Sequence, residues 1–148
     1  MQIPVSELIV RYMERLGIET VFGMPGAHIL PVYDGLYDSS IKTVLAKHEQ
    51  GAAFMACGLS RSSRKISGCL ATAGPGATNL VTGIANAYAD KLPVLAVTGE
   101  APTYIFGKGG LQESSGEGGS ISQEDLFRPI TRYSKMIERT DYLPNVLN

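Results

Sequence analysis

The sequence is poor in the residues that mark several large protein classes: it has no tryptophan, two cysteines and few charged side chains. Cys57 and Cys69 are too few for a disulfide framework or a zinc site, and we expect both to be buried, reduced thiols. The net charge of −1 argues against electrostatic binding to nucleic acid or to an anionic membrane. Because the chain has no apolar run of about 18 residues and no signal-peptide pattern, we expect a cytoplasmic protein.

The chain does contain a regular alternation of strand-like and helix-like segments, within 148 residues, the size of one domain. Strand 41–45 is β-branched and should be buried, and strand 93–99 is apolar on both faces, which is typical of the middle of a parallel sheet. Such repeated units predict an α/β fold, with three α/β/α layers around a mainly parallel sheet and right-handed crossovers. The expected strands are 20–22, 41–45, 66–72, 93–99 and 133–137, and the expected helices are 4–16, 27–36, 49–60, 78–89 and 123–127.

Two segments fall outside this pattern. Residues 100–122 hold six glycines and four serines, with too few apolar side chains for an element of their own. A long loop of this kind within a compact domain is usually functional or disordered. A new helix is predicted to begin at Leu143, shortly before the last residue. We therefore expect the chain to be cut at its C-terminal end, by design or by natural splitting of a larger enzyme.

Glu49 occupies the junction between the strand at 41–45 and the helix that follows it. In a parallel sheet this junction lies at the carboxyl edge of the strands, where ligands bind. One interpretation is that the carboxylate only complements the helix dipole, a contribution of about 0.3–1 kcal/mol. The other is that it meets a buried cofactor nitrogen and exchanges a proton with it. Position alone favours the first interpretation.

Glycines follow three of the predicted strands, at what should be one edge of the sheet: residues 23–26, residues 74–76 and Gly99. Each group alone is more often a tight turn than a binding loop. The Gly74-Pro75-Gly76 segment resembles the start of a dinucleotide-binding fingerprint, although Asn79 stands where the third glycine belongs. In that interpretation Glu100, after the next strand, is the candidate ribose ligand.

Other familiar signatures are absent from the sequence. It contains no P-loop, no Ser-His-acid arrangement and no His-Glu-x-x-His. His28 and His48 have no partner histidine at metal-ligand spacing, so we expect no metal site on this chain.

Five motifs, taken together, resemble those of a known family. Each is a weak signal alone, but they occur in the family's order and spacing over nearly the whole chain. The chain resembles the N-terminal pyrimidine-binding domain of thiamine-diphosphate enzymes, in the branch of acetolactate synthase, pyruvate oxidase and benzoylformate decarboxylase. The motifs are Val21-Phe22-Gly23-Met24-Pro25-Gly26, His48-Glu49-Gln50-Gly51-Ala52-Ala53, Thr72-Ala73-Gly74-Pro75-Gly76-Ala77-Thr78-Asn79, Ala89-Asp90-Lys91-Leu92-Pro93-Val94 and Thr98-Gly99.

The resemblance implies a thiamine-diphosphate-binding fold and a catalytic role for Glu49. In the family, the glutamate at this position hydrogen-bonds N1′ of the cofactor's aminopyrimidine and thereby promotes removal of the proton from thiazolium C2. Other residues match the loops beside the pyrimidine ring and the loop facing the neighbouring active site. These expected cofactor-binding residues are Pro75, Gly76, Asn79, Pro25 and Gly26.

The resemblance also places Gln123 where acetolactate synthases have a glutamine near the substrate. The sequence departs from the family beside it, since Ser122 replaces the usual phenylalanine, and again at Ala73, where serine is common.

The resemblance further implies what this chain lacks. The family binds the cofactor diphosphate and Mg²⁺ through a Gly-Asp-Gly motif on a separate domain, and neither that motif nor the central domain is present in residues 1–148. We therefore expect a pyrimidine-binding domain that is inactive alone and pairs with the diphosphate-binding domain of another subunit in a homodimer or tetramer. The whole enzyme would be a lyase or transferase that decarboxylates a 2-oxo acid and transfers or ligates the acyl unit. Two alternatives remain open, a non-catalytic assembly domain with the same fold and a dinucleotide-binding oxidoreductase domain.

Overall fold

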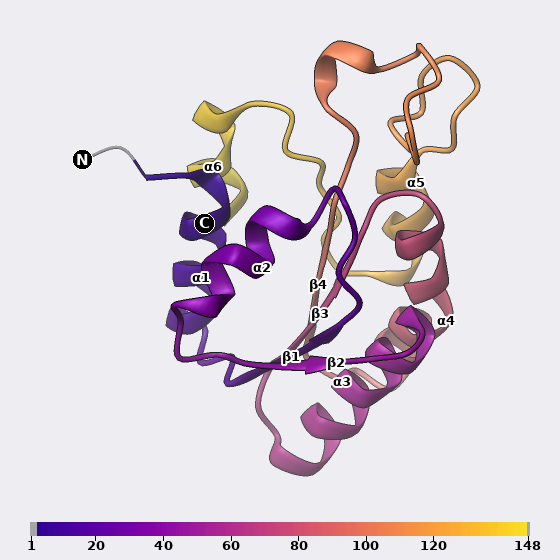
Figure 1. The fold of residues 1–148 in the computed structure, drawn as a ribbon. Helices are drawn as coiled ribbons and strands as arrows, with labels where there is room; N and C mark the ends of the chain where they lie inside the picture. Colours follow the sequence, from indigo (N-terminus) through magenta and orange to yellow (C-terminus); the bar gives the residue numbers. More distant parts are fainter. Residues whose placement is uncertain (1–2, 148) are drawn as a thin grey trace.

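The computed structural model describes residues 3–147, and a four-stranded parallel sheet lies at its centre (Figure 1). The strands are β1 (Thr20–Gly23), β2 (Lys42–Leu45), β3 (Ser67–Ala71) and β4 (Val94–Thr98), in the spatial order β2-β1-β3-β4. Because all neighbouring strands are parallel, their carboxyl ends meet at one edge of the sheet. The predicted three-layer α/β/α fold is confirmed.

Helices cover both faces of the sheet (Figure 1). Helices α1 (Val5–Arg15) and α2 (Leu30–Tyr37) pack on one face, and α3 (Glu49–Ser63), α4 (Pro75–Ala89) and α5 (Gln123–Phe127) pack on the other. The short helix α6 (Leu143–Leu147) returns to the side of α1, as Figure 1 shows. Single turns of 3-10 helix occur in the connections: η1 (Thr103–Ile105), η2 (Arg128–Ile130) and η3 (Thr140–Tyr142).

Most helix boundaries agree with the sequence prediction, including the helices at 123–127 and from Leu143. Three do not: α2 begins at Leu30 rather than at 27, α3 ends at Ser63 rather than at 60, and α4 begins at Pro75 rather than at 78. In α2 and α4 a proline stands in the first turn, where its fixed φ suits the helix and its missing N–H is not needed.

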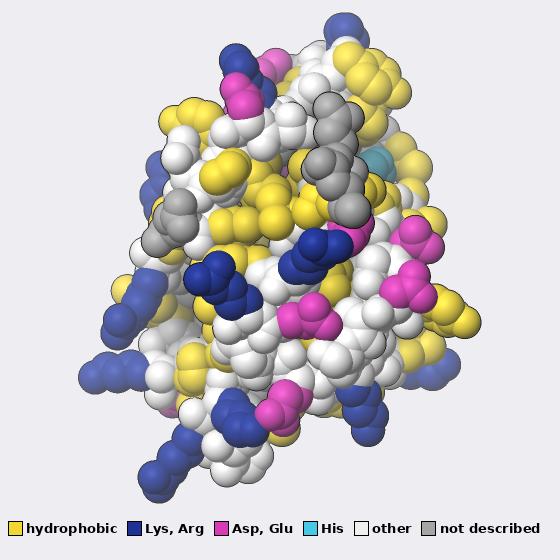
Figure 2. Space-filling model, turned by 90° about the vertical axis from the view of Figure 1, so that its left-hand side faces the viewer, with side chains coloured by type: hydrophobic (Ala, Val, Ile, Leu, Met, Phe, Trp, Pro, Cys, Tyr) yellow, Lys and Arg dark blue, Asp and Glu magenta, His cyan; other side chains and the backbone are white. Residues whose placement is uncertain are grey.

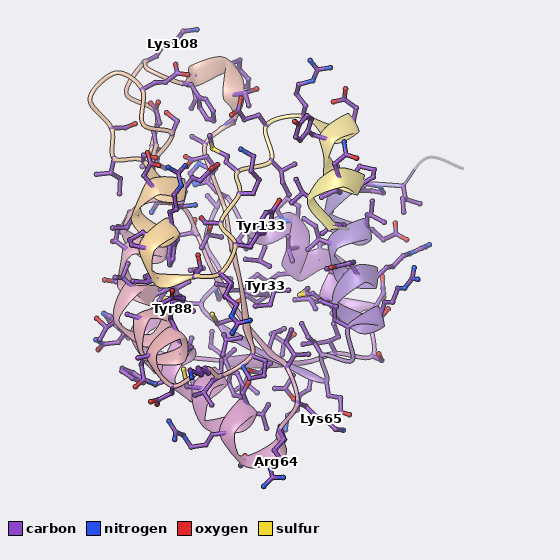
Figure 3. The ribbon with its side chains drawn as sticks, turned by 180° about the vertical axis from the view of Figure 1, so that it is seen from behind. Tyr33, Arg64, Lys65, Tyr88, Lys108 and Tyr133 are labelled. Atoms are coloured by element: carbon purple, nitrogen blue, oxygen red, sulfur yellow. The ribbon has the colours of Figure 1, made fainter. Side chains whose placement is uncertain are left out.

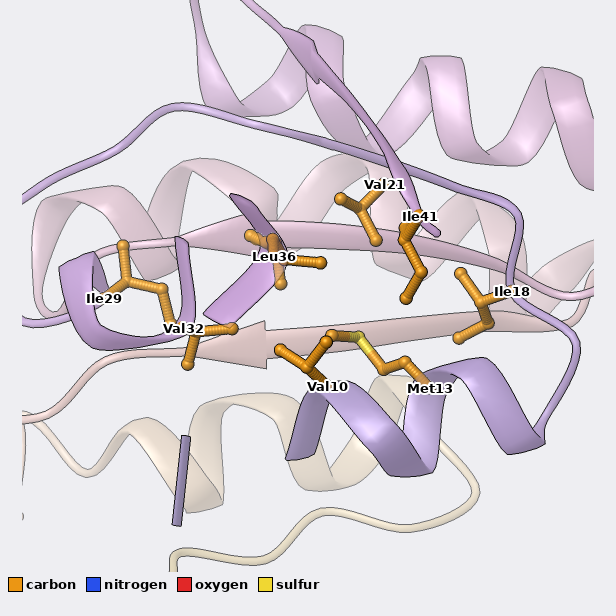
Figure 4. Close-up of a cluster of buried hydrophobic side chains, with 9 residues drawn as sticks. Val10, Met13, Ile18, Val21, Ile29, Val32, Leu36 and Ile41 are labelled. Carbon is orange, nitrogen blue, oxygen red and sulfur yellow. The ribbon is translucent and has the colours of Figure 1, made fainter. Parts of the chain in front are cut away.

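Helix α1 ends as its sequence predicts. Gly17 has a φ of +76°, its N–H donates to Glu14 O at 2.9 Å, and the next N–H, of Ile18, donates to Met13 O at 3.1 Å. The chain turned in this way buries one apolar cluster between α1, α2 and the sheet (Figure 4). Its members are Val10, Met13, Ile18, Val21, Ile29, Val32, Leu36, Ile41 and Leu70.

On the opposite face, α3 and α4 approach each other through small residues. Ala53 is fully buried, and a Cβ added to Gly83 would lie 2.3 Å from the Ala53 Cβ. The predicted buried thiols are confirmed: Cys57 donates to Gly83 O at 3.4 Å, and burial raises the pKa of Cys69 to about 12. The thiols therefore act as packing groups.

The positions of two strands in the sheet differ from the prediction. Strand β2 is an edge strand, and Leu45 at its end is 60% exposed. Strand β4 is the other edge rather than the middle of the sheet. Its apolar character on both faces has another cause, since Val97 packs on the α1 and α2 side and Ala96 on the α3 and α4 side. Coverage by helices on both faces, not a second neighbouring strand, requires the apolar side chains.

The predicted fifth strand at 133–137 is wrong. Within residues 3–147 this segment forms no strand, and it is attached to α5 by Glu124 instead of to the sheet. The Glu124 carboxylate accepts the Met136 N–H at 2.8 Å, and the Ser134 hydroxyl donates to the Glu124 carbonyl oxygen at 3.0 Å. Tyr133, labelled in Figure 3, is 63% exposed.

The glycine-rich segment at 100–122 is folded, and it contains η1 and an antiparallel bridge between Ser115 and Ser122, which the sequence did not predict. Its turn forms around Glu113, whose carboxylate accepts the N–H groups of Gly107 at 2.5 Å and Gly110 at 3.0 Å. Figure 3 shows Lys108 of this segment at one end of the molecule and Lys65 at the other.

None of the helices within residues 3–147 combines the length and the apolarity that a bilayer crossing requires. The cytoplasmic location expected from the sequence stays a prediction.

Candidate functional site

Glu49 is the first residue of α3 and lies beyond the carboxyl end of β2. His48 caps the helix, because its Nδ1 accepts the Gln50 N–H at 3.2 Å. The Glu49 side chain is buried, with 7% of the residue exposed, although a carboxylate that only complements a helix dipole has no need to leave solvent. Burial of this carboxylate favours the functional interpretation of Glu49.

One oxygen of the Glu49 carboxylate is bonded and the other is not. Oε2 accepts a hydrogen bond from Asn79 Nδ2, one turn into α4, at 3.0 Å. Oε1 accepts none from residues 3–147, and it faces Gly76, where an added Cβ would lie 3.5 Å away. The carboxylate is thus held by the amide on one side and keeps an oxygen for a ligand on the other.

The loop between β3 and α4 brings three predicted residues to this place. Gly74 has a φ of +58°, a conformation that strains any other residue, and its N–H donates to the Ser114 hydroxyl at 3.2 Å. The turn lets Pro75 open α4 at the surface and buries Gly76 beside Glu49. Pro75, Gly76 and Asn79 therefore lie together with Glu49, as the sequence predicted.

The loop after β1 meets the same edge of the sheet through Thr72, which follows β3. A Cβ added to Gly26 would lie 2.6 Å from the Thr72 Cβ, and one added to Gly76 would lie 2.7 Å from the Thr72 Cγ2. Pro25, next to Gly26, is exposed. The expectation that the glycine-bearing strand ends share one edge is confirmed, and Thr72 stands between two of them.

Gln112 lies at this edge as well, and the sequence did not single it out. Its Oε1 is 3.2 Å from the Thr72 hydroxyl and 3.2 Å from His28 Nδ1. The chain contains the dipeptide Gln-Glu twice, at 112–113 and at 123–124. That repetition is the one signal that could have pointed to Gln112.

Gln123, predicted to lie near the substrate, is buried behind the end of β4. Its Nε2 donates to Thr98 Oγ1 at 2.7 Å and to Gly99 O at 3.2 Å, and its Oε1 lies 3.2 Å from the Ser114 hydroxyl. Both ends of the amide are therefore used within the domain. The substrate role of Gln123 stays a prediction.

Glu100, the candidate ribose ligand of the dinucleotide alternative, is also engaged. Its Oε1 accepts the N–H groups of Ala101 at 2.7 Å and Ser114 at 2.9 Å, and its Oε2 lies 2.8 Å from the Ser114 hydroxyl. The carboxylate attaches the long loop to the end of β4, and these bonds leave little capacity for a ribose.

A shallow groove of about 500 Å³ lies elsewhere, over α2, and it contains none of the predicted site residues. Figure 2 shows the side of the molecule on which α1 and α2 lie in Figure 1, and apolar side chains gather there among charged ones. The hydroxyl of Tyr33, on the inner part of α2, is buried without a hydrogen-bond partner in residues 3–147, and burial raises its pKa to about 12. Within the same residues, no three His, Cys, Asp or Glu side chains gather in a way that could hold a metal ion.

The sheet is parallel, and its carboxyl edge carries glycine-bearing loops and a buried carboxylate with one oxygen unbonded within residues 3–147. This is the arrangement of an α/β cofactor-binding domain. The family model described as "Thiamine pyrophosphate enzyme, N-terminal TPP binding domain" matches residues 3–118. The chain therefore belongs to the thiamine pyrophosphate enzyme family, as its N-terminal cofactor-binding domain. This membership overturns the dinucleotide-binding alternative.

Similar proteins agree with this membership. The chain is 45% identical over 139 residues to a probable acetolactate synthase large subunit of Methanocaldococcus jannaschii, which covers 94% of this chain and 22% of the relative. It is 43% identical over 144 residues to the acetolactate synthase isozyme 1 large subunit of Escherichia coli, covering 97% of this chain and 24% of the relative. An acetolactate synthase of Mycobacterium bovis is 39% identical over 147 residues, 99% of this chain and 23% of the relative. The chain thus spans about a quarter or less of the relatives that it matches.

Proposed function

We propose that this chain is the pyrimidine-binding half of the active site in an enzyme that decarboxylates a 2-oxo acid and transfers or ligates the acyl unit, as the names of the similar acetolactate synthases suggest. The observation that carries the proposal is the buried Glu49 carboxylate, whose Oε1 is unbonded within residues 3–147 and faces Gly76. An aminopyrimidine nitrogen fits this carboxylate, because a proton shared between the nitrogen and Oε1 would form the hydrogen bond that Oε1 lacks.

Each residue of the site has a separate task in this proposal. Glu49 holds the proton shared with the aminopyrimidine nitrogen, and Asn79 fixes the carboxylate by its hydrogen bond to Oε2. Gly76 and Pro75 have no long side chain and leave room for the pyrimidine ring. Pro25 and Gly26 bound the same space from the end of β1. When bound, thiamine diphosphate supplies a thiazolium carbon that becomes nucleophilic and an electron sink for decarboxylation.

We further propose that the diphosphate and Mg²⁺ are held by a diphosphate-binding domain of another subunit, so that the chain works as part of a homodimer or tetramer. The outer face of α3 supports this assembly. Phe54 is 43% and Met55 37% exposed, and added Cβ atoms at Gly51 and Gly58 on the same helix would meet nothing within 4 Å. An open apolar helix face beside Glu49 is suited to a protein interface.

The test is hydrogen–deuterium exchange at C2 of thiamine diphosphate, measured in the assembled enzyme that carries this chain. The substitution Glu49→Gln should slow C2 exchange about 100-fold or more, the range of general acid–base catalysis. The matched control is Glu19→Gln, which also neutralises a glutamate but lies at the exposed salt bridge to Lys65. Near-normal exchange in Glu49→Gln would sink the proposal, and an assembled wild type without accelerated exchange would favour a non-catalytic assembly domain.

A further inference from the structure

We propose that His28 is a second catalytic residue of this site, which carries the proton of a carbonyl-derived oxygen on Nε2 and is oriented by Gln112. This inference rests on the proposed function and adds a group on the other side of Thr72 from Glu49. The ligand that it would take is the carbonyl compound, an aldehyde or a 2-oxo acid, that accepts the acyl unit.

The hydrogen bonds around Thr72 indicate which nitrogen of His28 carries the proton. Thr72 Oγ1 accepts the backbone N–H of His28 at 3.4 Å and donates its own hydrogen to Gln112 Oε1 at 3.2 Å. The same amide oxygen lies 3.2 Å from His28 Nδ1. Because an amide oxygen can only accept, the proposal assigns the ring proton to Nδ1.

Nε2 of a neutral His28 consequently keeps its lone pair. Nε2 has no hydrogen-bond partner in residues 3–147, and the residue is only partly buried, so a ligand at the sheet edge can reach it. In many catalytic sites a histidine base donates one ring N–H to an orienting acceptor and turns the other nitrogen toward the ligand. His48, the other histidine of the chain, uses its Nδ1 as a helix cap and has no such arrangement.

The His28 centre and Glu49 belong to one site because they share Thr72 as a neighbour. The Thr72 hydroxyl faces Gln112, whereas its Cγ2 fills the space where Gly76 lacks a Cβ. Gly76 in turn adjoins the Glu49 carboxylate. The His28 backbone in turn passes over Gly99 at the end of β4, where an added Cβ would lie 2.5 Å from its carbonyl oxygen. A ligand that reaches across Thr72 would therefore meet both centres.

The backbone of Gln112 has an unfavourable conformation, which the surrounding loop maintains. Its φ is +55°, an uncommon value for a residue other than glycine. The loop around it is fixed, because an added Cβ at Gly74 would lie 2.9 Å from the Gln112 carbonyl oxygen and because Ser114 is bonded to Glu100. Strained residues held by such contacts concentrate at functional sites.

The proton transfers need one proton from solvent, which the lone pair of Nε2 takes up before the acceptor reacts. When a carbon nucleophile adds to the acceptor's carbonyl carbon, its electron pair forms the new C–C bond, the C=O π pair moves to oxygen, and that oxygen takes the proton from Nε2. At product release an O–H bond breaks, its pair forms a C=O bond, and Nε2 regains the proton, while the pair of the breaking C–C bond stays with the departing carbon. The imidazole thus returns to the protonated state in which it met the acceptor.

The decisive variant is His28→Asn in the assembled enzyme. The asparagine amide can still donate to Gln112 but has no atom at the place of Nε2, so a merely structural role would be preserved. We expect kcat/KM for ligation to fall about 100-fold or more and C2 exchange to stay within about threefold of wild type. In His28→Ala, added imidazole should restore part of the lost rate, which also tests the proposal if the asparagine variant folds poorly.

A readout independent of turnover is the tautomer of His28, observed by ¹⁵N NMR in the 148-residue chain, which has two histidines. His28 should be protonated at Nδ1, and Gln112→Leu should mix the two tautomers. The proposal is overturned if His28→Asn ligates at the normal rate, if it loses C2 exchange together with ligation, or if His28 is protonated at Nε2. Absence of C2 exchange in wild type would instead refute the proposed function.

Discussion

The contact between α3 and α4 offers a sharp test of the packing that positions Glu49 and Asn79. An added Cβ at Gly83 would lie 2.3 Å from the Ala53 Cβ and 3.2 Å from the Ala53 backbone carbon. Carbon atoms pack at about 3.5–4.0 Å, so Gly83→Ala must push the two helices apart. A flexible side chain could move aside, but Ala53 has none.

The expected magnitude follows from two opposing effects. Overpacking of a buried contact costs about 1–3 kcal/mol, and replacing a glycine inside a helix by alanine recovers about 1 kcal/mol. Because the clash involves backbone as well as Cβ atoms, overpacking should cost about 2–3 kcal/mol, the upper part of its range, and we expect Gly83→Ala to lower the free energy of unfolding by about 1–2 kcal/mol. In the assembled enzyme the separation should also lengthen the Glu49–Asn79 hydrogen bond.

Urea unfolding of the 148-residue chain measures this effect. At a slope of about 2 kcal/mol per molar urea, the middle of the usual range, the midpoint should fall by about 0.5–1 M. Gly58→Ala is the matched control, since it makes the same change in α3 where an added Cβ would meet nothing within 4 Å. That control should raise the free energy of unfolding by about 0.5–1 kcal/mol. If both variants shift the midpoint upward, the close approach of α3 and α4 is refuted.

Two further predictions concern single buried or bonded groups. The Met136 N–H bonded to Glu124, with Lys135 nearby, lowers the pKa of that carboxyl. The ionised carboxylate therefore stabilises the fold above the usual carboxyl pKa, and this stabilisation is lost as the pH falls through the lowered value. When the free energy of unfolding is measured against pH in acid, the curve of Glu124→Gln should be flatter than that of wild type, and parallel curves would contradict this. Tyr33→Phe removes a buried hydroxyl that has no partner in residues 3–147, so thermal unfolding should show unchanged or higher stability, by up to about 1 kcal/mol, whereas a clear loss would reveal a missed hydrogen bond.

The sequence predicted the elements better than their places in the sheet. Strands and helices follow from local periodicity and turn residues, and Gly17 ends α1 as expected. Whether a strand is central or at an edge depends on which strands pair, and that is decided by crossovers far apart in the chain. The apolar pattern of β4 reflects helices on both of its faces, so it carries no information about its second neighbour.

The error at 133–137 has a similar origin. The segment has strand-like composition, but Glu124 binds the Met136 N–H that a strand would have used, and the Ser134 hydroxyl bonds to the carbonyl oxygen of the same glutamate. A charged acceptor that reaches across ten or more residues leaves no periodic trace in a sequence. Local propensity therefore lost to a tertiary hydrogen bond.

The candidate site was predictable where motifs lie at strand ends and was missed where the long loop supplies a residue. Glu49, Gly76 and Asn79 come together because parallel strands end at one edge. Gln112 reaches the same edge only through the fold of the glycine-rich loop, which depends on the Glu100 bonds to Ser114. Nothing in the loop's composition indicates that fold.

Glycine is required at the sheet edge for two different physical reasons, and the difference bears on function. Gly74 needs its positive φ of +58°, which makes the turn into α4. Gly26 and Gly76 have no positive φ, and their Cβ positions are instead closed by the Thr72 side chain. Thr72 can fill that space only because both neighbours lack a Cβ. It then presents a hydroxyl toward Gln112 and a methyl group toward Gly76. A single buried residue after a central strand therefore fixes the position of the His28 centre relative to Glu49, the two proposed proton-transfer groups of the site.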